Sequence, residues 1–113
     1  MSPLKSLTMR RAREVVEIVR SKGYRMSMPE EHEGCADSYL ECCGSVLRVV
    51  FFDARYSDGV VAKITPQLGD CDAAFYSPQG LYVLSQSPED IAAQLLRKAQ
   101  IMARIANLGE GQG

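Results

Sequence analysis

Residues 46–66 read VLRVVFFDARYSDGVVAKITP, and this stretch decides the fold. Segments 46–54 and 60–65 are rich in β-branched and aromatic side chains, which favour extended backbone. The letters SDG between them supply residues that tight turns prefer. The stretch therefore predicts the clearest β-hairpin of the chain.

Other segments on both sides of this hairpin also suggest strands. Segment 24–28 alternates apolar and polar residues, and AAFYSPQGLYVLS at 73–85 predicts a second hairpin around SPQG. Residues 29–37 predict an acidic loop, while 36–44, ADSYLECCG, fits either a short helix or a strand. Together these segments predict an antiparallel sheet of three to five strands.

The first segment of the chain predicts a helix over residues 2–23. Ser2 can cap free N–H groups, and Pro3 suits the first turn because its missing donor has no partner there. Gly23 can end the helix in a left-handed conformation.

The last segment predicts a second helix, over residues 87–108. Ser87 is the expected N-cap, Pro88 opens the first turn and Gly109 ends the helix. The order helix, strands, helix predicts a single α+β domain over 1–113, with both helices on one sheet face. We expect residues 1–3 and 109–113 to be frayed.

Charge is unevenly distributed along a chain whose net charge is only −1. Residues 1–25 carry seven basic and two acidic groups (+5), and the remainder carries six and twelve (−6). A basic segment can bind nucleic acid, here through Arg10, Arg11, Arg13 and Arg20. It has no interleaved aromatic residues, and a sheet follows where a helix-turn-helix needs another helix, so we expect no direct contact with nucleic acid.

The sequence gives no sign of export or of a membrane span. The N-terminal letters MSPLKSLTMRR lack the apolar core of a signal peptide, and no stretch of about 18 apolar residues occurs. We therefore expect a cytoplasmic protein without membrane contact, with its thiols reduced.

Four cysteines and one histidine raise the question of a reactive or metal site. A zinc site would use His32, Cys35, one of Cys42 or Cys43, and Cys71, but the close ligand pairs typical of zinc sites are missing. If Cys42 and Cys43 lie on a strand, they point to opposite faces. The loop around His32 and Cys35 is acidic, which disfavours a reactive thiolate. We interpret the cysteines as small buried hydrophobic residues.

No other residue pattern predicts catalysis. Asp70 and Asp72 lie two residues apart and could bind a hard cation, but aspartate is common in turns for local hydrogen-bonding reasons. The sequence contains no phosphate-binding loop, nucleophile elbow or zinc-protease motif. We expect a protein that is not an enzyme and has no metal or cofactor.

The C-terminal helix carries more apolar surface than one sheet face can cover. Its apolar arc spans about 180°, against the ~100° that a helix on a sheet needs, and Ile101 and Leu108 fall outside that arc. The first helix, a second copy of the chain or another protein could cover this surface. The residues expected to offer it are Leu4, Leu7, Ile18, Leu96, Ile101, Met102, Ile105 and Leu108.

The opening SPLKSLTMRRAREVVEIVR and the ending SPEDIAAQLLRKAQIMARIANLGEGQG, with the length and element order, resemble the LasR-specific quorum-sensing antiactivators of pseudomonads. The resemblance implies a non-enzymatic inhibitor that binds the ligand-binding domain of a LuxR-type transcription factor. Such binding blocks the factor's dimerisation and its DNA binding. A homodimer is expected, and other stoichiometric protein inhibitors or chaperones fit the same residues.

Overall fold

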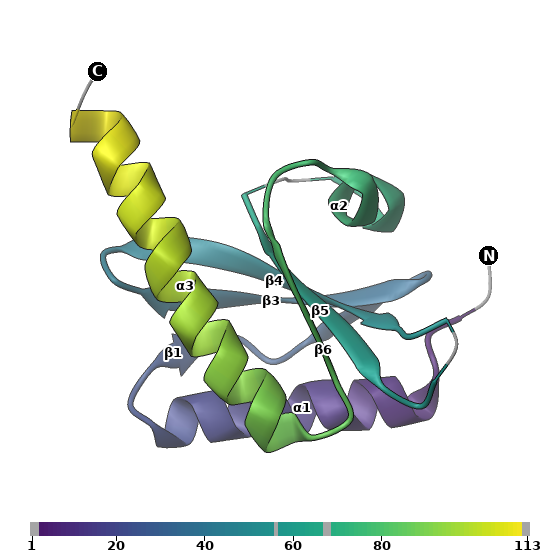
Figure 1. The fold of residues 1–113 in the computed structure, drawn as a ribbon. Helices are drawn as coiled ribbons and strands as arrows, with labels where there is room; N and C mark the ends of the chain where they lie inside the picture. The colour runs from purple at the N-terminus through teal and green to yellow at the C-terminus, as the bar shows by residue number, and fades with distance from the viewer. Residues whose placement is uncertain (1–2, 56, 67–68, 112–113) are drawn as a thin grey trace.

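The computed structural model describes residues 3–55, 57–66 and 69–111. Its elements run in the order of one helix, five strands, a short helix, a strand and a long helix (Figure 1). Their bounds are α1 Ser6–Ser21, β1 Arg25–Met26, β2 Glu30–His32, β3 Cys35–Cys42, β4 Ser45–Asp53, β5 Val60–Thr65, α2 Cys71–Tyr76, β6 Leu81–Ser85 and α3 Pro88–Gly111.

The predicted hairpin lies in the middle of an antiparallel sheet. β4 pairs with β5 in a register that sets Val50 opposite Lys63 and Phe51 opposite Ala62. The strand order is β1-β3-β4-β5-β6, with β2 pairing with β3. The hairpin and the α+β class with an antiparallel sheet are confirmed, and the open choice for residues 36–44 is decided in favour of strand β3.

The sheet has six strands, so the prediction of three to five was too low. The unforeseen strand is β2, which lies in the expected acidic loop and pairs with the start of β3. Gly34 has a positive φ of 99°, which permits the tight turn between the two strands. All three β2 residues are exposed, so this strand has backbone pairing but no hydrophobic pattern to reveal it.

The segment before β6 is a helix, so the predicted second hairpin is wrong. α2 begins after Asp70, whose Oδ1 accepts a hydrogen bond of 2.8 Å from the Ala73 backbone N–H. This N-cap satisfies a free donor of the first turn and favours helix over strand. Only Leu81–Ser85 of the expected hairpin is extended, and it pairs with β5.

α1 begins at Ser6, later than predicted, and Ser2 lies outside the described residues. The Asp53 carboxylate, at the end of β4, accepts hydrogen bonds from the Lys5 backbone N–H at 3.2 Å and from the Thr8 hydroxyl. A distant side chain thus satisfies the free N–H of Lys5, the N-cap residue, whose own side chain caps nothing. Gly23 follows the helix with a φ of 95°, and its N–H bonds to Arg20, which confirms the predicted end.

Alternate residues of the strands enter two different apolar clusters. The first, called the main core here, joins strand residues to α1 and α3 and includes Val15, Val19, Leu40, Val49, Phe51, Ile64, Ile91 and Leu95. The second core contains Cys35, Val50, Phe52, Cys71 and Ala74, two of which belong to α2. Because neighbouring strand residues point to opposite faces, the two cores lie on opposite sides of the sheet.

α3 is the longest helix, and its start is the predicted one. The Ser87 hydroxyl accepts a hydrogen bond from the Asp90 backbone N–H at 3.2 Å, and the helix continues to Gly111, past the expected stop at Gly109. Twenty-four residues at about 1.5 Å each give a length of about 36 Å. Figure 1 shows its C-terminal part extending beyond the strands. Among the described helices, none has both the length and the apolar character needed to cross a membrane.

Candidate functional site

One stripe along α3 changes from polar to apolar where the helix leaves the sheet. The stripe consists of Gln94, Lys98, Ile101 and Ile105, spaced three or four residues apart and therefore on one side of the helix. Gln94 bonds to Asp90 at 2.9 Å, and Lys98 Nζ donates to the Tyr82 carbonyl at 2.6 Å. Ile101 and Ile105 expose 43% and 60% of their surface. These two isoleucines are called the α3 patch below.

The other residues expected in the binding surface lie in different places. Leu96 belongs to the main core, and Leu4 is buried in a small cluster with Met9 and Ala36. Their side chains contact this chain and are not free for another. The remaining members are partly buried: Leu7, Ile18 and Met102, the last two packed on the main core; the Leu108 side chain lies outside the described part.

Lys63 of β5 links the sheet to the C-terminal end of α2. The side chain is fully buried, and Nζ donates to the carbonyls of Ala74 and Ser77 at 2.7 Å and of Phe75 at 3.3 Å. The ammonium also lies 4.7 Å from the centre of the Tyr82 ring. A positive charge at the C-terminal end of a helix meets carbonyls that lack helical partners, so it stabilises that end.

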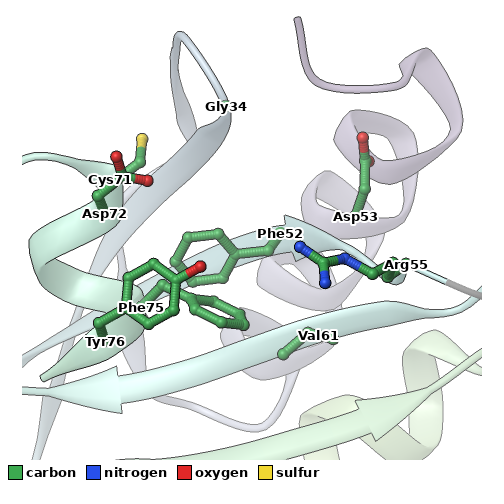
Figure 2. Close-up of a pocket in the computed structure, with 9 residues that line it drawn as sticks. All are labelled: Gly34, Phe52, Asp53, Arg55, Val61, Cys71, Asp72, Phe75 and Tyr76. Carbon is green, nitrogen blue, oxygen red and sulfur yellow. The ribbon is translucent and has the colours of Figure 1, made fainter. Parts of the chain in front are cut away.

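A pocket of about 470 Å³ opens beside α2, on the sheet face opposite the main core (Figure 2). The Phe75 ring lies 5.0 Å from both Phe52 and Tyr76 in edge-to-face contacts. Arg55 reaches over this aromatic side, and 72% of Tyr76 is exposed. Its lining combines aromatic rings with the Arg55 guanidinium and the carboxylates of Asp53 and Asp72. Sequence reasoning missed it because it assigned residues 73–76 to a strand.

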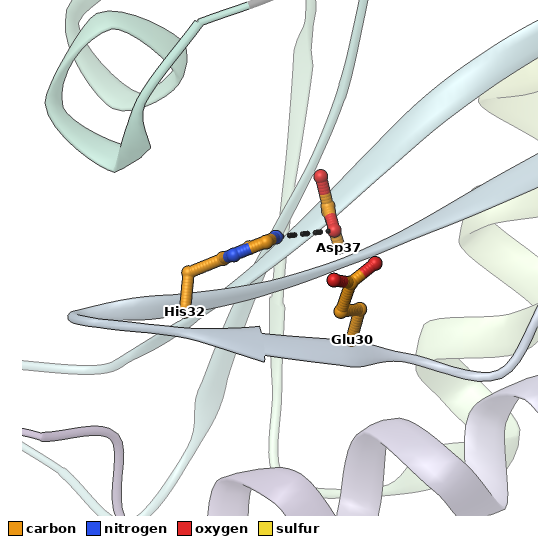
Figure 3. Close-up of side chains that lie close together, drawn as sticks. All are labelled: Glu30, His32 and Asp37. Atoms are coloured by element: carbon orange, nitrogen blue, oxygen red, sulfur yellow. Dashed lines mark hydrogen bonds and ion pairs between the residues drawn. The ribbon is translucent and has the colours of Figure 1, made fainter.

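Glu30, His32 and Asp37 bring three possible metal-ligating atoms within 4.8 Å of one another (Figure 3). Both Asp37 oxygens are already bonded, one to His32 Nε2 at 2.9 Å and the other to Arg48 Nε at 3.1 Å. The Arg48 guanidinium is almost wholly buried, and its charge beside this carboxylate opposes a second cation. The His32–Asp37 and Arg48–Asp37 interactions therefore link β2, β3 and β4 to one another.

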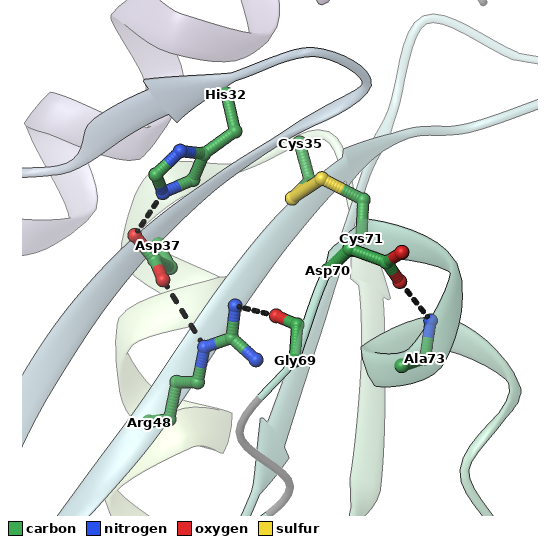
Figure 4. The surroundings of a disulfide bond; sticks show 8 residues. All are labelled: His32, Cys35, Asp37, Arg48, Gly69, Asp70, Cys71 and Ala73. Carbon is green, nitrogen blue, oxygen red and sulfur yellow. Dashed lines mark hydrogen bonds and ion pairs between the residues drawn. A yellow bond between two sulfur atoms is a disulfide. The ribbon is translucent and has the colours of Figure 1, made fainter.

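The cysteines are paired, so their interpretation as free buried thiols was wrong. Cys35 and Cys71 form a disulfide with a Cα–Cα distance of 5.7 Å, and it joins the start of β3 to the start of α2 (Figure 4). Cys42 and Cys43 are bonded to each other at the other end of β3. Arg48 NH2 donates to the Gly69 carbonyl at 3.0 Å and so fixes the chain near Cys71.

Of the residues considered as zinc ligands, His32, Cys35 and Cys71 lie close together, because His32 pairs with Cys35 and Cys35 is bonded to Cys71. Cys42 and Cys43 lie at the other end of β3, so the fourth ligand is not brought to this group. Cys35 and Cys42 are the first and last residues of β3, about 23 Å apart at ~3.3 Å per residue. Cys43 does not point away from Cys42 as a strand residue would, because its φ of 61° turns it into the β3–β4 loop. Asp70 caps α2, which is the local turn role expected of it.

No family model matches this chain, and no curated protein or solved structure matches it. The polar clusters of the described part bind other parts of the same chain, whereas the two isoleucines of the α3 patch are exposed.

Proposed function

We propose that the chain is a non-enzymatic regulatory protein that acts by binding another protein through the α3 patch. Its partner is the ligand-binding domain of a LuxR-type transcription factor, and binding blocks that factor's dimerisation and DNA binding. The protein acts as a homodimer, with α1 and α3 on one face of each sheet. The observation that carries the proposal is the exposure of Ile101 and Ile105 on a helix whose inward side is buried.

The inward side of α3 is fully used within the chain. Ile91, Leu95 and Ala99 are completely buried, and Ala103 is 1% exposed. The polar part of the stripe is also engaged, since Lys98 bonds to β6. Among the α3 side chains that the structure describes, Ile101 and Ile105 are the large apolar ones that are exposed. Such placement favours contact with a second helix or an apolar groove of another protein.

The size of the patch indicates how it can be used. Each isoleucine moved from water into an interface contributes about 1.5–3 kcal/mol before the costs of association. One copy supplies two such residues, and a homodimer that leaves both patches exposed supplies four. A homodimer built in this way would also double the apolar surface near a larger partner.

The identity of the partner rests on the resemblance of the opening and closing segments to quorum-sensing antiactivators. The α3 patch supports protein binding in general. The basic residues of α1 give less support to nucleic-acid binding, because Arg11 donates to the Asp58 carbonyl and Arg20 Nε donates to the Met26 carbonyl at 2.7 Å. Arg10 and Arg13 are the exposed basic residues in the middle of α1.

The test mixes the purified chain with the purified ligand-binding domain of a LuxR-type regulator and measures mass by size-exclusion chromatography with light scattering. We expect a stoichiometric complex, and loss of the regulator's binding to its DNA site. In Ile101→Asp/Ile105→Asp, two charges would have to be desolvated in the interface. We expect this variant to bind at least about tenfold more weakly, since 1.4 kcal/mol is one factor of ten.

Leu84→Asp is the matched control. Leu84 is 62% exposed, close to the 60% of Ile105, but it lies on β6 and on the face opposite the main core. It should bind like the unsubstituted chain. If Leu84→Asp weakens binding equally, the interface lies elsewhere. If the double variant binds as the unsubstituted chain does, the α3 patch is not the interface. Binding of DNA by the chain alone, weakening steeply with salt, would favour the nucleic-acid alternative.

A further inference from the structure

The β3–β4 turn brings two sulfur atoms together at an exposed end of the sheet. β3 ends at Cys42, which pairs with Ser45, so Cys43 and Gly44 form a two-residue loop. Both loop residues have positive φ, 61° and 81°, as in the type I′ turn of tight hairpins. This backbone turns Cys43 out of the strand, and its sulfur is bonded to that of Cys42.

Packing explains only one of the two cysteines. Cys42 is 4% exposed and belongs to the main core, whereas Cys43 is exposed. The first position of such a turn favours Asn, Asp or Gly, because a positive φ is costly for other residues. A cysteine in this conformation contributes neither to the core nor to turn formation. Unfavourable backbone at an exposed reactive residue points to a chemical role.

The pair is also open to small molecules. A depression of about 370 Å³ is lined by Glu41, Ser45 and Val46 together with Cys42, Cys43 and Gly44. A reagent can therefore reach Cys43 from solvent. Once one sulfur has reacted, the second lies within bonding reach, so the next step is intramolecular and fast.

We propose that Cys42 and Cys43 form a reversible thiol–disulfide exchange site for low-molecular-weight disulfides, such as glutathione disulfide. The Cys43 thiolate attacks one sulfur of the disulfide RSSR, forms a Cys43–SR bond and releases RS⁻. The Cys42 thiolate then attacks the Cys43 sulfur, closes the Cys42–Cys43 bond and releases the second RS⁻. Overall the two thiols lose two electrons and two protons, and RSSR gains them as two RSH.

The second disulfide is in a different environment and serves as an internal reference. Cys35 is fully buried and Cys71 is 7% exposed, both in the second core under α2. Thiol exchange requires access of the attacking sulfur, so this bond should react more slowly. The chain thus combines a shielded structural bond with an exposed exchange site.

The test uses the full chain, mildly reduced and then treated with glutathione disulfide. Cleavage after basic residues and after glutamate releases residues 42–48, CCGSVLR, which contains no other cysteine. We expect this peptide to lose the mass of two hydrogen atoms and to retain no glutathione. In Cys42→Ser the resolving thiol is missing, so Cys43 should keep one glutathione. Dithiothreitol should reverse both changes.

Two further measurements make the result decisive. Alkylation of the reduced chain should be roughly tenfold faster at Cys43 than at Cys71, because exposure governs thiol reactivity. Phenylarsine oxide, which needs two close thiols, should protect residues 42–48 of the reduced, unsubstituted chain from alkylation. This measurement does not depend on whether Cys42→Ser folds. Retention of glutathione by the unsubstituted peptide, absence of any reaction there, or equal alkylation of Cys43 and Cys71 would overturn the proposal.

Discussion

Replacing Cys35 and Cys71 together by serine is expected to lower the free energy of unfolding by about 4 kcal/mol. The disulfide joins residues 36 apart and closes a loop that contains the whole β3–β4–β5 meander. Without it, the unfolded chain gains the entropy of that loop, which is the main source of the loss. Urea unfolding followed by circular dichroism, at equal protein concentrations, measures the change.

Cys43→Ser is the control for this experiment. It removes an exposed sulfur and leaves the Cys35–Cys71 bond in place, so its effect should stay within about 1 kcal/mol. Dithiothreitol should shift the unsubstituted chain toward the double variant and leave the double variant nearly unchanged. A loss below about 1 kcal/mol in the double variant would contradict a constraining role for the bond.

Replacing Lys63 by methionine is expected to lower the free energy of unfolding by about 3 kcal/mol. Methionine keeps the apolar stem but leaves the carbonyls of Ala74 and Ser77 without the ammonium that bonds to them at 2.7 Å. Unpaired polar groups at the buried end of α2 are costly. Because Lys63 is the link from β5 to the end of this short helix, the loss should be largest at α2.

Amide hydrogen exchange locates this effect. We expect faster exchange over Cys71–Tyr76 in Lys63→Met, with little change in α1. Lys98→Met is the matched control, because its Nζ also donates to one carbonyl, that of Tyr82, but the residue is only partly buried. It should lose about 1 kcal/mol or less. Equal losses of unfolding free energy in both variants would show that the burial of Lys63 adds nothing to its contribution to stability.

The sequence predicted the elements whose signals are local. The β4–β5 hairpin has two runs of β-branched and aromatic residues, and α3 has its cap at Ser87. β2 was missed because a strand with three exposed polar residues differs from a loop only in its backbone pairing. α2 was missed although its cap at Asp70 is local, because the other end of this short helix is held by Lys63, which belongs to β5.

The candidate site was predicted in outline. Periodicity showed that α3 carries excess apolar surface, and it placed both Leu96 and Ile105 among the residues that offer this surface. The structure separates the two residues, because Leu96 is 8% exposed in the main core whereas Ile105, nearer the C-terminal end of α3, is 60% exposed. A helical projection describes the side of a helix and gives no information on what covers each turn.

The sequence by itself determined the fold class, the central hairpin and the two terminal helices, because propensity, alternation and capping act between residues close along the chain. Only the tertiary structure decided which sulfurs pair, which carboxylate caps α1, and which apolar residues of α3 stay exposed. Those outcomes depend on contacts between residues tens of positions apart, such as Cys35 with Cys71 and Asp53 with Lys5. No periodicity within a short segment carries that information.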